Sequence, residues 1–172
     1  MSSIPHIYLF GPAVIRKDGA KAPLARKTLA LLAYLIVTQR AHSRRALMNL
    51  FCQESDDPAA ALRWHLSRIR RHVAPTLLIA AEENIRFDPD AASVDVLHFL
   101  AWITDEQRMA AAVDLYQGEL LAGVDVKDAP EFELWLLGER SRIHHLYTRG
   151  LEQIMEREIA AVMEAFGKGP FV

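Results

Sequence analysis

The sequence holds one cysteine, no long apolar run and no leader-like N-terminus, and each absence excludes a class of protein. Cys52 alone cannot form an internal disulfide or a cysteine-based zinc site. The longest apolar run, residues 29–37, is about half as long as a membrane-spanning helix. No charged segment precedes an apolar core at the N-terminus, so we find no secretory signal. We therefore expect a cytoplasmic protein without a membrane partner.

The sequence also lacks a convincing active site. His144 and His145 are adjacent, so a helix would point them about 100° apart, which prevents both from binding one metal ion. Neither His65 nor His72 shares a helical face with Ser67, which argues against a nucleophilic pair. An acidic cluster without calcium-loop spacing comprises Asp125, Asp128, Glu131 and Glu133. We expect no enzymatic activity, no metal ion and no cofactor.

The composition is that of a chain that can bury a hydrophobic core, and the two halves of the chain carry opposite net charges. Of the 172 residues, 51% are hydrophobic and 24% charged, which excludes a largely disordered chain. Residues 1–75 carry 12 Lys and Arg against 4 Asp and Glu, a net +8. Residues 76–172 carry 8 against 18, a net −10, and the two sum to the overall −2. A basic half of this kind indicates an anionic partner.

Short strands are expected at both ends of the basic half. Residues 6–24 alternate apolar and polar side chains around breaks at Gly11 and Asp18, which predicts strands joined by hairpins. Residues 76–80 and 84–88 are two further β-prone runs, and their short separation predicts a hairpin.

Between the strands, helical spacing predicts three helices, at residues 26–39, 44–51 and 58–73. Ser43 is the expected N-cap of the second helix, and Asp57 followed by Pro58 is the expected start of the third. The order of elements is therefore strands, three helices and a hairpin.

The acidic half is expected to be wholly helical after residue 92, with a domain boundary near residues 88–93. Apolar periodicity predicts helices over residues 94–103 and 105–116 and a long helix from Pro130 to about residue 166, capped by Asp128. The apolar face of the long helix comprises Phe132, Trp135, Leu136, Ile143, Leu146, Tyr147, Leu151 and Ile154.

The third helix divides into distinct faces. It carries four arginines between residues 63 and 71 and no acidic residue between 58 and 73. At 100° per residue, a core-facing stripe comprises Leu62, Leu66, Ile69 and Val73. The opposite face comprises Trp64, Ser67, Arg68 and Arg71. Arg63 and Arg70 lie on one flank, and His65 lies on the other.

Three features favour DNA contact over a solvated basic face. The helix lacks acidic residues, arginine suits phosphate oxygens and guanine edges, and a third helix followed by a hairpin is the order of a winged helix-turn-helix. The role of Trp64 stays open between a buried anchor against the second helix and apolar contact with a thymine methyl group.

Four segments resemble, in order and spacing, the winged-helix domain of SARP-type regulators, the antibiotic regulatory proteins. They are "RKTLALLAYLIV", "SRRALMNLFCQESDD", "ALRWHLSRIRRHV" and "IRFDPDAASVDVLHF". The segment "LYQGELLAGVDVKDAPEFELWLLGERSRIHHLY" is similar to the start of the bacterial transcriptional activator domain that follows in that family. Its matching residues are Gly118, Leu121, Gly123, Pro130, Phe132, Trp135, Glu139 and Arg140.

The resemblance implies a mainly α fold with small β elements. An OmpR-type winged helix-turn-helix is expected over residues 1–90 and an α-helical, tetratricopeptide-like activator domain over 93–166, with a tail at 167–172. The helical domain of the family extends further than this chain does, so a fragment or a short member is expected.

The resemblance also implies site residues, because Arg63, Ser67, Arg68 and Arg70 match the recognition helix of the family. With the helical wheel, the residues expected to contact bases are Trp64, Ser67, Arg68 and Arg71. The residues expected to contact phosphates are Arg26, Lys27, Arg44, Arg45, Arg63, Arg70 and Arg86. The hairpin tip departs from the glycine-rich pattern of the family, and Glu82 and Glu83 there would repel phosphate.

The expected function is a sequence-specific transcriptional regulator, by resemblance an activator that binds promoter repeats in double-stranded DNA and recruits RNA polymerase. We expect a homodimer on DNA, on direct or inverted repeats, and association with the bacterial nucleoid when bound. The alternative is a protein-interaction adaptor whose winged helix no longer binds DNA.

Overall fold

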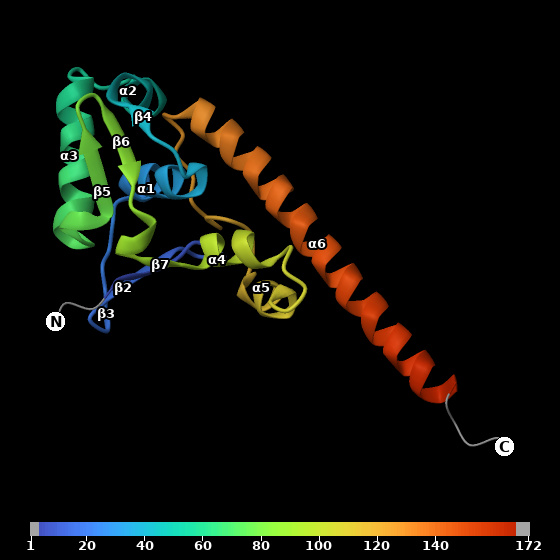
Figure 1. Cartoon of the computed structure of the whole chain (residues 1–172). Coiled ribbons are helices and arrows are strands. Elements are labelled where there is room, and N and C mark those ends of the chain that lie inside the picture. The colour runs from blue at the N-terminus through green and yellow to red at the C-terminus, as the bar shows by residue number, and fades with distance from the viewer. Residues whose placement is uncertain (1–3, 168–172) are drawn as a thin grey trace.

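The basic half contains two small sheets, and the first of its helices is drawn between them in Figure 1. The computed structural model describes residues 4–167. The first sheet has the order β3-β2-β1-β7, with β1 at His6–Tyr8, β2 at Val14–Lys17, β3 at Ala20–Lys21 and β7 at Ser93–Val94. The second has the order β4-β6-β5, with β4 at His42–Ser43, β5 at Leu78–Ala81 and β6 at Asn84–Phe87. The expected hairpins are confirmed, whereas β7, which pairs parallel with β1, was not predicted.

Three helices lie against the second sheet, namely α1 (Arg26–Thr38), α2 (Arg44–Phe51) and α3 (Pro58–His72). Both expected N-caps are confirmed. The Ser43 hydroxyl accepts a hydrogen bond from the Ala46 N–H at 3.1 Å, and the Asp57 carboxylate accepts one from the Ala60 N–H at 2.8 Å. Each cap satisfies a backbone donor that a helix leaves unpaired in its first turn.

The acidic half contains α4 (Asp95–Trp102), α5 (Met109–Leu115) and α6 (Pro130–Gly167). The periodicity predicted all three helices, although α5 begins at Met109 rather than at residue 105. The expectation of a wholly helical segment is wrong for residues 116–129, which form a loop. Gly118, Leu121 and Gly123 have φ values of 149°, 53° and 74°, which a right-handed helix does not accommodate. A Cβ on Gly118 would lie 3.2 Å from the Cα of Gly11, so the close approach requires glycine there.

A buried carboxylate joins the first sheet to the acidic half. Asp95, at the start of α4, is 7% exposed. It accepts hydrogen bonds from the N–H groups of Leu9 at 2.9 Å, Phe10 at 3.0 Å and Val96 at 2.7 Å. Burial raises the pKa of Asp95, and the three N–H donors oppose that rise.

The loop 116–129 strengthens this joint. The Leu121 N–H donates to the Leu9 carbonyl at 2.8 Å, so the loop runs beside the segment that follows β1. The Arg140 guanidinium of α6 donates to the carbonyls of Leu120 at 2.8 Å and Leu121 at 2.7 Å. Arg140 therefore fastens the loop to the long helix, and Glu133 of α6 adds a second contact by accepting the Val126 N–H at 2.6 Å.

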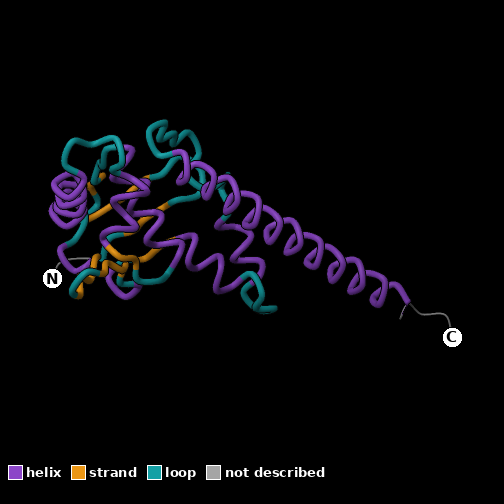
Figure 2. Tube along the Cα trace, turned by 90° about the horizontal axis from the view of Figure 1, so that it is seen from above, coloured by secondary structure: helices purple, strands orange, loops and turns teal. Residues whose placement is uncertain are grey.

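The first turns of α6 pack on the basic half through aromatic rings. Phe132 lies 5.2 Å from Phe51 of α2, and Trp135 lies 4.8 Å from Tyr34 of α1, measured between ring centroids. Beyond these contacts α6 runs past α4 and α5 and then away from the other elements, as Figures 1 and 2 show from two directions.

The buried apolar residues of both halves form one continuous cluster. The division into two domains at residue 90 stays a prediction. Of the expected tail, Gly167 is the last residue of α6, and residues 168–172 lie outside the described residues. Within residues 4–167, no helix combines the length and the apolar composition needed to cross a membrane.

We predict that Asp95→Asn lowers the free energy of unfolding by about 1–3 kcal/mol, because the amide nitrogen would face backbone donors that then lack a buried acceptor. Chemical denaturation of the full chain measures this loss. Asp105→Asn is the matched control, since the Asp105 carboxylate is exposed, accepts one hydrogen bond, from the Gln107 N–H, and pairs only with the exposed Arg108 at 3.7 Å. Equal midpoints for wild type and Asp95→Asn would contradict the prediction.

Candidate nucleic-acid interface

The helical wheel predicts the burial of the aliphatic stripe of α3 correctly. Leu62 and Leu66 are each 1% exposed, and Ile69 is fully buried. The residues of the opposite face, hereafter the outward face, are all exposed: Trp64, Ser67, Arg68 and Arg71. Packing of the stripe on α1 and α2 therefore leaves a basic and amphipathic surface towards solvent.

Trp64 does not serve as a buried anchor. Its side chain is 51% exposed, so this alternative from the sequence is wrong. The guanidinium carbon of Arg68 lies 5.4 Å from the centroid of the Trp64 ring, within the range of a cation–π interaction. This contact restricts the Arg68 side chain while leaving its N–H donors unpaired by protein.

His65 is buried, although the wheel placed it on a flank. Its Nδ1 shares a hydrogen bond of 2.8 Å with the Thr28 hydroxyl of α1. Burial, with the Lys27 ammonium as the second cause, lowers the pKa of His65, and Asp128 opposes this shift. A neutral imidazole thus fastens α3 to α1 and sets the direction of the outward face.

Three arginines line a hollow between α2, α3 and the β5–β6 turn, and we call this the arginine hollow. Its volume is about 590 Å³. Arg44 of α2 contributes to it, together with Arg63 and Arg70 of α3. Glu83 of the turn also lines it, and the Glu83 carbonyl accepts the Arg44 N–H at 2.8 Å. The hollow is therefore a cationic site with one carboxylate at its border.

Most of the side chains that are expected to contact phosphates have a cationic group without a protein partner. Among residues 4–167, six of these side chains make no hydrogen bond or ion pair: Arg26, Arg44, Arg45, Arg63, Arg70 and Arg86. The same holds for Arg71 of the outward face. Lys27 differs, because its ammonium pairs with the Asp128 carboxylate. Asp128, the expected cap of α6, thus neutralises a residue that the sequence assigned to phosphate.

The hairpin of β5 and β6 is the wing, and its tip is short and acidic. Two residues, Glu82 and Glu83, connect the strands, and both are exposed. Glu82 has φ of 52°, a left-handed conformation that tight turns require. Arg86 is exposed on β6, below the tip. The arginine of the wing, Arg86, therefore lies on the strand β6 rather than in the turn.

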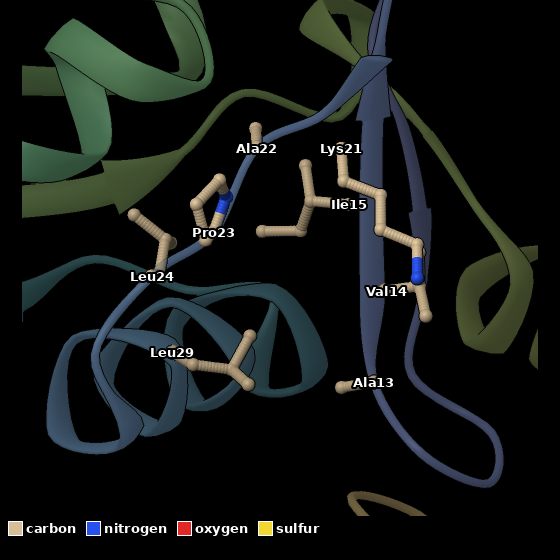
Figure 3. Close-up of a pocket in the computed structure, with 8 residues that line it drawn as sticks. All are labelled: Ala13, Val14, Ile15, Lys21, Ala22, Pro23, Leu24 and Leu29. Carbon is tan, nitrogen blue, oxygen red and sulfur yellow. The ribbon is translucent and has the colours of Figure 1, made fainter. Parts of the chain in front are cut away.

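A second hollow, of about 250 Å³, lies between β2, β3 and the start of α1 (Figure 3). Ile15, Pro23, Leu24 and Leu29 supply much of its apolar lining, and Lys21 is the one charged residue among the lining residues. The lining provides neither a nucleophile nor an acid–base pair, so the hollow is apolar in character.

No protein-family model and no curated protein matches the chain. Among solved structures, EmbR of Mycobacterium tuberculosis in complex with a low-affinity phosphopeptide is similar, with a TM-score of 0.67 and 21% sequence identity. The chain has the fold of EmbR. EmbR is a SARP-type regulator, so the likeness confirms the expected fold, a mainly α winged helix followed by a helical part. The match covers 95% of this chain and 49% of EmbR, so the chain spans about half the length of EmbR.

Sequence reasoning missed the position of Glu83 beside the arginines of the EmbR-like winged helix. The two β-prone runs are separated by only three residues, which signals a tight turn, and in the structure the two-residue turn between β5 and β6 contacts the start of α2. It also missed the His65–Thr28 contact, because no local pattern joins residues that lie 37 positions apart.

We predict that the free energy of unfolding falls as the pH drops below about 6.5, because the pKa of His65 is lower in the folded chain than its usual 6.5. The unfolded chain then binds the extra proton. His65→Gln removes this titration and flattens the dependence between about pH 7.5 and pH 5.5. His42, whose pKa burial also lowers, contributes a slope of the same sign, whereas the raised pKa of Asp95 contributes one of the opposite sign.

Chemical denaturation at each pH measures this dependence. His145→Gln is the control, because His145 is exposed on α6. Parallel stability curves for wild type and His65→Gln would contradict the assignment of the titration to His65.

Proposed function

We propose that the chain is a sequence-specific DNA-binding transcriptional regulator that places α3 in the major groove. One observation carries the proposal: the outward face of α3 presents Ser67, Arg68 and Arg71 to solvent, beside a hollow in which three more arginines converge. An arginine-bearing third helix of a winged helix-turn-helix is suited to enter the major groove, which admits one α-helix.

The outward face is proposed to contact base edges. The guanidinium fork of Arg68 matches the O6 and N7 acceptors of guanine, and the Trp64 ring restricts its movement before binding. Ser67 and Arg71 supply further hydrogen-bond donors, and the exposed indole of Trp64 suits contact with a thymine methyl group.

The arginine hollow is proposed to bind backbone phosphates. Arg44, Arg63 and Arg70 lie there without protein partners among the described residues. Exposed arginines elsewhere extend the phosphate contacts: Arg26, Arg45 and Arg86. Lys27 contributes less than the sequence suggested, because Asp128 neutralises it. Phosphate contacts set the position and much of the affinity, whereas base contacts set the specificity.

The family resemblance suggests a more specific form of this function. We propose an activator that binds promoter repeats as a homodimer, because one winged helix covers only a short half-site, and that recruits RNA polymerase through its helical part. Phosphopeptide binding by EmbR is not carried over, because this chain matches only 49% of that protein.

A protein-interaction adaptor is the second candidate function. Glu82 and Glu83 at the wing tip favour it, because carboxylates repel phosphate and Glu83 borders the arginine hollow. The two functions differ in one measurable property, the affinity for DNA at low salt.

We predict that the chain binds mixed-sequence duplex DNA and that log K falls steeply with log salt concentration. Release of about six phosphate counterions gives a slope near −5. Replacing Arg44, Arg63 and Arg70 together by alanine is expected to make the slope shallower by about 3, because each lost phosphate contact removes about 0.9.

Fluorescence anisotropy with a labelled duplex, at several salt concentrations above about 50 mM, measures the slope. The matched control replaces three arginines of the acidic half, Arg108, Arg142 and Arg149, and is expected to leave the slope unchanged. Undetectable binding at the lowest salt would exclude the regulator and leave the adaptor.

A further inference from the structure

α6 carries two apolar faces, and only one of them is covered. The covered face includes Phe132, Leu136 and Ile143, which are fully buried against the rest of the fold. Exposed large apolar residues lie on the other side: Leu134, Leu137, Met155, Ile159, Val162, Met163 and Phe166. At 100° per residue these residues fall within a sector of about 100°. We call this sector the outer face of α6.

The outer face is most regular in the half of α6 that projects from the fold (Figure 1). Met155, Ile159, Val162 and Phe166 follow one another at intervals of four, three and four residues, the spacing of a heptad seam. Their exposed fractions range from 53% to 82%. Such a seam supports a stable interface only when a second helix packs on it.

The base of the projecting half is held in place from the other side. Arg157 pairs with Glu106 of the α4–α5 connection at 2.9 Å, and Gly150 packs against the Ile103 side chain. These contacts leave the outer face directed away from α4 and α5. The seam therefore lies on a part of α6 whose base is held by contacts with the α4–α5 connection.

The charges that border the seam indicate the partner. On the wheel, Glu152 and Glu156 lie along one edge of the seam and Glu158 along the other, and all three are exposed. None of these carboxylates has a protein partner among residues 4–167. A second copy of the chain would place acidic edges against acidic edges, which disfavours self-pairing. A helix with basic edges would instead pair with them.

We infer that the outer face of the projecting half of α6 binds an amphipathic helix of another protein, one with an aliphatic stripe flanked by lysine or arginine. The heptad spacing supplies apolar anchors at successive turns, and the acidic edges select the sign of the partner. Met155 and Met163 add flexible apolar side chains that adapt to the exact shape of the partner. This interaction is separate from the basic surface of α3.

The test uses the full chain and a synthetic peptide of about three heptads, with leucine at the seam positions and lysine at the flanking positions. Two peptides serve as controls, one with glutamate in place of each lysine and one with the same composition in scrambled order. Fluorescence anisotropy of labelled peptide measures binding. We expect the lysine peptide to bind at least about tenfold more tightly than either control, a difference of about 1.4 kcal/mol.

Paired variants locate the binding surface. Val162→Asp, on the seam, is expected to weaken binding of the lysine peptide at least tenfold, or by about 1.4 kcal/mol. Ala161→Asp adds the same charge to an exposed position of the helix about 130° from the centre of the seam and is expected to leave binding unchanged. Replacing Glu152, Glu156 and Glu158 together by lysine is expected to reverse the preference towards the glutamate peptide. Helical content by circular dichroism checks that each variant folds.

Three results would overturn the inference. They are equal binding of the lysine and scrambled peptides, equal loss in Val162→Asp and Ala161→Asp, and sedimentation of the wild-type chain as a dimer that Val162→Asp converts to monomer. The last result would identify a second copy as the occupant of the outer face.

Discussion

The buried carboxylate of Asp95 is the interaction on which the arrangement of the two halves depends. It accepts the N–H groups of Leu9 and Phe10 where the chain leaves β1, and it begins α4. An acidic side chain is seldom buried unless its oxygens are fully hydrogen-bonded, so this contact specifies one position of α4 on the first sheet. Arg140 of α6 donates hydrogen bonds to the loop carbonyls of Leu120 and Leu121, and this contact fixes the position of α6 relative to the same segment. The long helix is consequently held in register with the winged helix.

The same framework explains why the basic surface is organised. The aliphatic stripe of α3 is buried on α1 and α2, and the His65–Thr28 hydrogen bond fixes the rotation of the helix. The outward face must then point to solvent, while Arg63 and Arg70 turn towards α2 and the wing. Two classes of arginine on one helix follow from packing, and the proposed division between base and phosphate contacts follows from that geometry.

Local chemistry made much of the fold predictable from the sequence. The caps Ser43 and Asp57, the periodicity of the helices and the wing hairpin each act within a few residues, so propensity and pattern suffice. Long-range contacts were not predictable in the same way. Two examples are the parallel pairing of β7 with β1 and the ion pair of Lys27 with Asp128. Each joins segments that lie roughly 90 to 100 positions apart in the sequence, and no periodicity encodes such a contact. Burial of His65 similarly depends on Thr28 of another helix.

The proposed division between base and phosphate contacts is tested by comparing Arg68→Ala with Arg63→Ala, because both arginines are exposed on α3. Affinity of each variant is measured for a site selected from random duplexes and for mixed-sequence DNA at one salt concentration. We expect Arg68→Ala to lower the ratio of specific to nonspecific affinity, at a cost of about 1–3 kcal/mol, whereas Arg63→Ala is expected to weaken binding to both duplexes alike. Equal losses on both duplexes for both variants would contradict the proposed division.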